Sequence, residues 1–359
     1  MSMRHVYLDN AASTPMDPEV LEHMVPFLLE HHGNPSSVHH HGRKLRAVIE
    51  KSRKEIAALL GAAPAEIFFT SGGTEADNMA LKGCEANGIT HFISTRIEHH
   101  AVTHPLEAFE KKGKKVSWIP VDETGHPDLE ALERALAEGP RAMVCLMHAN
   151  NEVGTILDME AVAKCCQRHD AIFHSDTVQS MANVKFNLAE TPVQFLAASA
   201  HKFYGPKGIG FLYMRSGMQI PAMLCGGSQE RNLRAGTENV ASIAAMAFSL
   251  GKCYANFEKK NTHLSELKQY LWEGLKRTVP GIQVNGTLEP GKAIPTVLNV
   301  AFPSDSTESM LLFNLDINGI SASGGSACTS GSVVGSHVLA GMGHSPVRAA
   351  NSVRFSFGM

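Results

Sequence analysis

The sequence predicts an α/β protein, in which a large domain built on a mostly parallel, seven-stranded sheet is joined to a smaller α+β domain. The length of 359 residues is typical of two domains. Apolar residues make up 43% of the chain and charged residues 19%, which allows a large core. Short apolar runs alternate with amphipathic segments over most of the chain. The predicted large domain spans residues 16–257, and the small one combines residues 1–15 with residues 258–359.

Two predicted helices precede the sheet. One spans residues 18–31, and the other spans residues 43–60, where apolar residues recur at helical spacing and Gly61 ends the helix. Strands are predicted at residues 67–70, 91–95, 116–120, 142–147, 171–175, 195–198 and 210–214, and helices from residue 75 and at residues 102–112, 129–137 and 159–168. We interpret this order as five β-then-α units in succession, which predicts a largely parallel sheet covered on both faces.

The alternation of apolar strands and amphipathic helices ends near residue 257. Residues 238–257 form the most apolar long helix candidate, but Ser242, Ser249 and Lys252 interrupt it well short of a membrane span. A polar helix is predicted over residues 259–277, followed by short strands and glycine-rich turns. This change predicts where the main part of the smaller domain begins.

Composition and charge exclude several classes of function. The net charge of −3 argues against a nucleic-acid-binding surface. Seven cysteines without CxxC spacing indicate neither a disulfide framework nor a zinc site, and a reducing interior is their natural compartment. Residues 1–15 lack the apolar core of a signal peptide. We therefore expect a cytoplasmic protein that binds neither nucleic acid nor a membrane.

A lysine follows one of the predicted buried strands. Lys202 lies just past residues 195–198, and turn chemistry begins at Gly205-Pro206. The carboxyl ends of strands are where α/β sheets bind their ligands, and a lysine there can become a nucleophile that forms a Schiff base. An ordinary surface lysine in a loop explains this stretch equally well.

Another strand end carries small residues, Ser71-Gly72-Gly73-Thr74, before a helix. Small residues let backbone N–H groups approach an anion, so a phosphate would fit this helix N-terminus. The alternative is a plain capping box, in which Thr74 caps the helix and Asp77 lies three residues on.

Further strand ends supply an acid and several imidazoles. Asp176 follows a buried strand, where a carboxylate needs a cationic partner, either a nearby Arg or Lys or a protonated ring nitrogen. His99 and His148 follow two other strands. Pyridoxal phosphate needs such a set of groups: a phosphate-binding loop, an imidazole that can stack on its ring, an acid, and a lysine that reacts with its aldehyde.

Seven separated motifs carry a resemblance to a known family. They are residues 9–15, 33–37, 71–78, 150–154 and 201–208, Ser326-Ala327-Cys328, and Val353-Arg354-Phe355-Ser356. In order and spacing, from residue 7 to residue 357, they resemble the cysteine desulfurases of the NifS/IscS type. Those are class V members of the fold-type I enzymes that use pyridoxal phosphate, so the resemblance implies that fold and that cofactor.

The resemblance also implies roles for the cofactor-binding residues. Lys202 would hold the cofactor as a Schiff base and later move the substrate Cα proton, and Asp176 would keep the pyridine nitrogen protonated. Gln179 would hydrogen-bond the ring oxygen, and His99 would stack on the ring face. Asn151 would lie close to the substrate or the ring oxygen. The implied phosphate ligands are Gly73, Thr74, Ser199 and His201, together with Thr237 from the other subunit of a homodimer.

The substrate side of the site is implied in the same way. Arg354, helped by Asn34, would grip the substrate carboxylate through a bidentate pair. Cys328 lies in a run of small residues that predicts a mobile, exposed loop, and an exposed thiolate can attack sulfur. The other six cysteines are interpreted as structural. Members of this family usually continue as a final helix beyond the strand of Arg354, so we expect either that the chain is truncated or that its small domain is unusually short at its C-terminus.

The histidine-rich stretch His31, His32, His39, His40 and His41 could suggest a metal site. Consecutive histidines point in different directions and no Cys or acid completes a ligand set nearby, so we expect no metal. His39 and Arg43 are expected instead to edge the substrate pocket near Asn34.

These inferences lead to one predicted function: a homodimeric L-cysteine desulfurase that uses pyridoxal phosphate. It would convert L-cysteine to L-alanine, leave a persulfide on Cys328, and pass the sulfur to an acceptor protein such as an iron–sulfur scaffold. A selenocysteine lyase or another class V enzyme is the alternative within the family. A non-catalytic sulfur-trafficking paralogue is the alternative outside catalysis, and it is disfavoured because both Lys202 and Cys328 are present.

Overall fold

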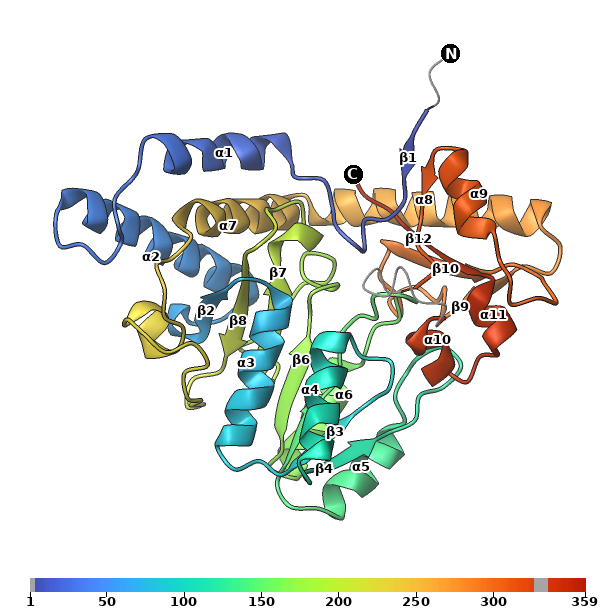
Figure 1. The fold of residues 1–359 in the computed structure, drawn as a ribbon, viewed down its shortest axis with the longest axis horizontal. Helices are drawn as coiled ribbons and strands as arrows, with labels where there is room; N and C mark the ends of the chain where they lie inside the picture. Colours follow the sequence, from blue (N-terminus) through green and yellow to red (C-terminus); the bar gives the residue numbers. More distant parts are fainter. Residues whose placement is uncertain (1–3, 326–334) are drawn as a thin grey trace.

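The large sheet of the protein has the predicted seven strands. The computed structural model describes residues 4–325 and 335–359 (Figure 1). The strand order is β2-β8-β7-β6-β5-β3-β4. These strands are β2 (Ile67–Thr70), β3 (His91–Ser94), β4 (Lys115–Trp118), β5 (Ala142–Cys145), β6 (Ile172–Asp176), β7 (Phe195–Ser199) and β8 (Gly210–Met214). Only β8 runs antiparallel to its neighbours, β2 and β7, so the prediction of a mostly parallel sheet is confirmed.

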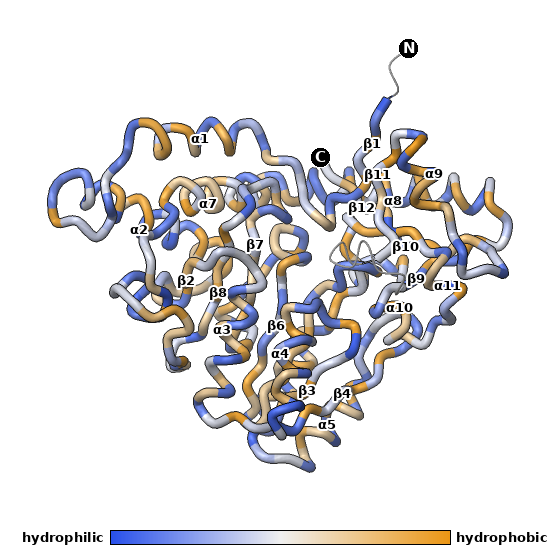
Figure 2. The backbone as a smooth tube through the Cα atoms, in the orientation of Figure 1, coloured by the Kyte–Doolittle hydropathy of each residue, from blue (hydrophilic) through white to orange (hydrophobic). Residues whose placement is uncertain are grey.

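Helices cover both faces of this sheet, because most of its strands are buried on both sides and read as continuous apolar runs. One face packs against α3 (Gly73–Ala86) and α4 (His100–Lys111). The other face packs against α2 (His40–Leu60), α5 (Leu129–Ala137), α6 (Met159–Arg168) and α7 (Val240–Ala255). Helix α1 (Pro18–Leu29) lies outside this layer, against α7. Apolar segments concentrate inside the layers, and the exposed loops are hydrophilic (Figure 2).

Two local expectations about the large sheet are wrong. Strands β2 to β5 are each followed by a helix, but β6 continues to β7 through turns, so the described chain contains four β-then-α units here, not five. Helix α3 begins at Gly73 with Gly72 as its N-cap, and it has no side-chain cap. The helix therefore starts before the expected residue 75, and the alternative of a capping box at Thr74 is excluded. Asp77 is instead buried within the fold and bonds to a distant histidine.

A second, smaller sheet is formed by the end of the chain. Strands β9 (Gln283–Asn285), β10 (Val297–Ala301) and β12 (Ser352–Ser356) form an antiparallel sheet in the order β12-β10-β9. The long helix α8 (Phe257–Thr278) packs on it through an apolar cluster around Leu264. The short helix α9 (Leu311–Ile317) packs on the same cluster, and the short helices α10 (His337–Gly341) and α11 (Pro346–Ala350) pack in a separate cluster with Ile97 and Val153.

The N-terminal segment joins the smaller sheet region. Strand β1 (Val6–Tyr7) pairs in parallel with β11 (Ile320–Ser321), and Asp9 forms a bridge to Ser356. The segment then crosses towards the large sheet (Figure 1). The division into domains at residues 15 and 257 remains a prediction. None of the described helices is both long and apolar enough to cross a bilayer.

Candidate active site

A cavity of about 450 Å³ opens at the carboxyl ends of the parallel strands. Strand ends of β2, β5, β6 and β7 meet there, together with the N-terminal segment and β12. This is the edge at which open α/β sheets bind their ligands. Ten residues that the sequence singled out line this cavity: Gly73, Thr74, His99, Asn151, Asp176, Gln179, Ser199, His201, Lys202 and Arg354.

Lys202 lies on a single 3₁₀ turn, Ala200–Lys202, which directly follows β7. Its ammonium group donates hydrogen bonds to the backbone oxygens of Ala11 at 2.6 Å and Ala12 at 2.9 Å. The chain can reverse after this turn because Tyr204 adopts a left-handed backbone conformation with φ of 66°. The sheet and the N-terminal segment together therefore place this amine at the cavity.

Asp176 ends β6 and is 5% exposed. Its Oδ1 accepts a hydrogen bond from the Val178 N–H at 2.9 Å. Burial raises the pKa of this carboxyl to about 6, although the nearby charge of Lys202 acts in the opposite direction. A carboxylate in this position is stabilised by a cation that enters the cavity, such as a protonated ring nitrogen.

The helix N-terminus of α3 forms a compact anion cradle. Ser71, Gly72, Gly73 and Thr74 line the cavity, with Ser199 and His201 close by. A Cβ on Gly73 would lie 2.5 Å from the Val178 side chain, so only glycine fits there. Glu75 also lines the cavity, but its carboxylate is engaged by Arg234 at 2.9 Å and by the Ser71 N–H at 2.7 Å. Backbone N–H groups at this end can therefore face a phosphate.

Two imidazoles at the cavity are neutral at neutral pH. Burial, followed by the charge of Lys202, lowers the pKa of both His99 and His201 to about 4. His99 caps α4, and its Nδ1 accepts the N–H of Ala101 at 3.1 Å. The hydrogen therefore lies on Nε2 of His99. A neutral ring of this kind can stack on an aromatic cofactor without adding charge.

Gln179 and Asn151 present amides to the cavity. The Gln179 Nε2 donates to the Ala11 backbone oxygen at 2.9 Å. The Asn151 Oδ1 is buried without a hydrogen-bond partner in the described part of the chain. Such an orphaned acceptor inside a ligand-sized cavity is the kind of group that a bound molecule satisfies.

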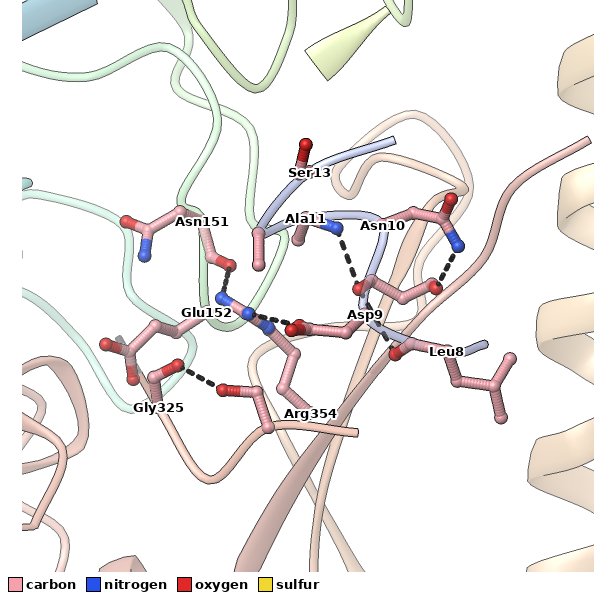
Figure 3. Close-up of polar contacts among 12 residues, drawn as sticks. Leu8, Asp9, Asn10, Ala11, Ser13, Asn151, Glu152, Gly325 and Arg354 are labelled. Carbon is pink, nitrogen blue, oxygen red and sulfur yellow. Dashed lines mark hydrogen bonds and ion pairs between the residues drawn. The ribbon is translucent and has the colours of Figure 1, made fainter. Parts of the chain in front are cut away.

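Arg354 is held in place by groups from two other segments (Figure 3). It lies on β12 and is 2% exposed. Its Nη2 contacts Asp9 Oδ1 at 2.8 Å, and its Nη1 donates to the Asn151 backbone oxygen at 2.9 Å. Figure 3 shows Asp9 and Asn151 approaching the guanidinium from separate segments of the chain. A buried arginine needs such partners, because an uncompensated guanidinium is costly inside a protein.

Two of the predicted site residues do not line this cavity. Asn34 and Thr237 are both exposed, as are His39 and Arg43. Asn34 is therefore not brought together with Arg354 within one chain. The two loops that carry Asn34 and Thr237 are linked, since Gln229 donates to the Ser36 hydroxyl at 3.3 Å. Cys328 lies outside the described residues. Of the other cysteines, Cys225 is exposed and Cys84, Cys145, Cys165, Cys166 and Cys253 are buried.

Sequence reasoning missed several polar partners around the cavity. Asp9 belongs to one of the seven sequence motifs, but the sequence alone assigns it no role. His174 lies two residues before Asp176 on β6, and its Nε2 is 3.1 Å from Asp77 Oδ1, with both side chains fully buried. No local signal pairs residues that are so far apart in the chain. The alternating pattern of β6 does place His174 on the same strand face as Asp176.

The residues of the cavity fit pyridoxal phosphate. The cofactor's phosphate matches the N–H groups at the start of α3, and its ring nitrogen matches Asp176. Its aldehyde matches the amine of Lys202. No group of three or more metal-binding side chains occurs among the described residues.

Comparison with known proteins places the chain in a class. The profile of the class V aminotransferase family matches residues 6–359, and the chain belongs to this family of pyridoxal-phosphate-dependent enzymes. Within it, the chain is 43% identical over 359 residues to cysteine desulfurase IscS of Dictyoglomus turgidum, covering 99% of this chain and 90% of that protein. It is 40% identical to the putative cysteine desulfurase IscS 1 of Bacillus subtilis, covering 99% of this chain and 94% of the relative.

Solved structures agree with this placement. A NifS-like protein superposes with a TM-score of 0.91 at 36% identity, covering 99% of this chain and 94% of that one. SspA in complex with cysteine superposes with a TM-score of 0.86 at 31% identity, with 98% of both chains covered. The prediction of a NifS/IscS-like class V protein is therefore confirmed.

Proposed function

We propose that this protein is an L-cysteine desulfurase that uses pyridoxal phosphate and releases L-alanine. The observation that carries the proposal is the convergence of Lys202, Asp176 and Arg354 on one cavity. An amine, an acid and a carboxylate-binding guanidinium are what such an enzyme needs for an amino-acid substrate. Full-length similarity to cysteine desulfurases supports cysteine as that amino acid.

Each residue of the cavity has a separate role in the proposed reaction. The cofactor, when bound, supplies an aldehyde and an electron-accepting ring. Lys202 removes the proton from the substrate Cα and later returns one. Asp176 would keep the ring nitrogen of the cofactor protonated, and the neutral His99, which also lines the cavity, would offer a ring for stacking. Arg354 binds the substrate carboxylate, and the start of α3 binds the phosphate.

The Cys328 thiolate attacks the sulfur of the bound cysteine. A sulfur–sulfur bond forms and the carbon–sulfur bond breaks, so that Cys328 becomes a persulfide. The former Cβ takes up a proton, and the product is L-alanine. The persulfide sulfur then passes to an acceptor protein, such as an iron–sulfur scaffold, in the cytoplasm.

Two copies of the chain complete each site in this proposal. Thr237, which is exposed and outside its own cavity, reaches the phosphate bound by the second copy. Asn34 lies on a loop joined to the same exposed segment through the Gln229–Ser36 hydrogen bond. In the proposed dimer, Asn34 therefore belongs to the surface that contacts the second copy.

The test is a Cys328→Ala variant of the cofactor-loaded protein. We expect it to lose persulfide and sulfide formation from L-cysteine and to retain the absorption band of the bound cofactor. The matched control is Cys225→Ala, because Cys225 is the exposed cysteine of the described chain and lies outside the cavity. Undiminished sulfide release by Cys328→Ala would contradict the proposal. Efficient release of selenide from selenocysteine in that variant, without cysteine turnover in either form, would favour a selenocysteine lyase instead.

A further inference from the structure

The N-terminal segment from Asp9 to Thr14 passes along the cavity, which its residues 11–13 line, and it touches several functional groups there. Its backbone is fixed on one side by Ser356: the Asn10 Nδ2 donates to the Ser356 backbone oxygen at 2.9 Å, and the Ala11 N–H donates to the Ser356 Oγ at 2.8 Å. On the other side, the Thr14 hydroxyl donates to the His201 backbone oxygen at 3.0 Å. These anchors do not involve the Asp9 side chain, so the path of the segment is set without it.

The Asp9 carboxylate is directed at Arg354 (Figure 3). The two side chains form an ion pair at 2.8 Å, with Arg354 2% and Asp9 22% exposed. The Arg354 Nη1 donates a hydrogen bond to the Asn151 backbone oxygen at 2.9 Å. The Arg354 Nε is buried and has no hydrogen-bond partner among the described residues. A guanidinium has five N–H groups, and a carboxylate binds it best through two of them on one side.

The orientation of the guanidinium plane is fixed by two acceptors, Asp9 Oδ1 and the Asn151 backbone oxygen, which bind its two terminal nitrogens. Without Asp9, only the Asn151 oxygen would hold it, and the side chain could rotate about its last torsions. With Asp9 in place, the Nε–H still has no partner among the described residues, and the buried positive charge is compensated before any ligand arrives.

We propose that Asp9 is a positioning residue for substrate recognition, which holds the Arg354 guanidinium in the orientation that accepts the substrate carboxylate. The proposal deepens the proposed function and rests on it. An ion pair that only ties the N-terminal segment to β12 is the competing explanation. The two differ in one respect: a purely structural pair affects stability and leaves the affinity for carboxylates unchanged.

The first experiment uses the cofactor-loaded protein and the variants Asp9→Ala and Asp9→Asn. An asparagine oxygen can still accept from Nη2, whereas alanine cannot. We expect Asp9→Ala to raise KM for L-cysteine about tenfold or more, as loss of a hydrogen bond to a charged group does, while kcat changes far less. Asp9→Asn should restore most of the affinity. An unchanged KM in Asp9→Ala, or a lower KM in both variants, would overturn the proposal, the latter because Asp9 would then only compete for Arg354.

The second experiment does not depend on turnover. Propionate binding to the cofactor-free protein is measured by calorimetry, with propionamide as the uncharged comparison. We expect Asp9→Ala to weaken propionate binding and to leave any propionamide binding unchanged. The matched control is Asp17→Asn, which removes the charge of another N-terminal ion pair, to Lys252 at 2.7 Å, outside the cavity. Equal loss of propionate affinity in Asp9→Ala and Asp17→Asn would overturn the proposal. If the parent protein binds propionate and does not turn over cysteine, the proposed function fails independently of this inference.

Discussion

Burial determines whether two acidic residues, Glu98 and Asp77, are ionised in the folded chain. Glu98 is fully buried, and its Oε1 accepts from the Met147 N–H at 2.9 Å and from the Thr95 hydroxyl at 3.2 Å. Burial raises its pKa to about 8. Burial also raises the pKa of Asp77 well above its usual value, with further contributions from Asp176 and Glu98. These acids are therefore largely protonated in the folded chain under conditions in which the unfolded chain ionises them.

This arrangement predicts how stability depends on pH. Between the unfolded pKa of Glu98 and its folded pKa of about 8, the folded chain binds more protons, so stability falls as pH rises through this window. Buried histidines such as His148, whose pKa burial lowers to about 4, act in the opposite direction only below about pH 6.5. We expect the urea midpoint of the cofactor-free protein to fall from pH 7 to pH 8, and Glu98→Gln to reduce that slope. An identical slope in the variant would contradict the assignment.

At the scale of elements, one loop is held in a conformation that its sequence disfavours. Glu230, Arg231 and Asn232 have φ values of 43°, 56° and 67°, and left-handed backbone costs about 1–2 kcal/mol per non-glycine residue. Glu230 forms a paired contact with Arg53 of α2, at 2.8 Å and 2.9 Å, and accepts the Phe69 N–H at 2.9 Å. Arg234 anchors the same loop to Glu75. These contacts hold the loop that leads to Thr237 against β2 and α3.

Removing the Arg53 guanidinium should therefore destabilise the whole fold. We expect Arg53→Met to lower the free energy of unfolding by about 3–5 kcal/mol, because it leaves the Glu230 carboxylate buried without a cationic partner. The measurement is urea unfolding followed by circular dichroism. The matched control is Lys51→Met on the same helix, whose pair with Glu55 is exposed and should change stability by about 0.5 kcal/mol or less. Equal effects of the two variants would contradict this interpretation.

At the scale of the whole molecule, the proposed function assigns the exposed loops around Asn34 and Thr237 to contacts with a second copy of the chain. A symmetric dimer would let each copy offer these loops to the other's cavity. The Gln229–Ser36 contact gives the two loops a common surface. Thr237 therefore offers a way to test the assembly through the site.

Co-expression of Lys202→Ala chains with Thr237→Glu chains provides this test. Each variant alone should be inactive, since one lacks the amine and the other brings a negative charge to the phosphate. Random pairing makes half of the dimers mixed, each with one intact site, so we expect about a quarter of the parent activity. No recovery on co-expression, or full activity of Thr237→Glu alone, would contradict a shared site.

Local patterns in the chain were enough to predict much of the fold. Helix α5 and strands β2 and β8 lie where periodicity and turn residues placed them, because their apolar residues repeat at the spacing that each element buries. Strand ends rich in small or ionisable residues predicted which positions meet at the cavity, since parallel strands end at the same edge. The start of α3 was predicted too late, because Gly72 and Gly73 resemble a turn.

The sequence by itself therefore determined the class of the protein, its mostly parallel sheet and ten of the residues that line its cavity. Only the tertiary structure decided which distant groups pair with one another: Asp9 with Arg354, 345 residues apart, and Arg53 with Glu230, 177 apart, as ion pairs, and Asp77 with His174, 97 apart, as a hydrogen bond. The physical reason is that periodicity and capping act between neighbours in the chain. The partner of a buried charge is chosen by the packing of elements, which no local pattern encodes.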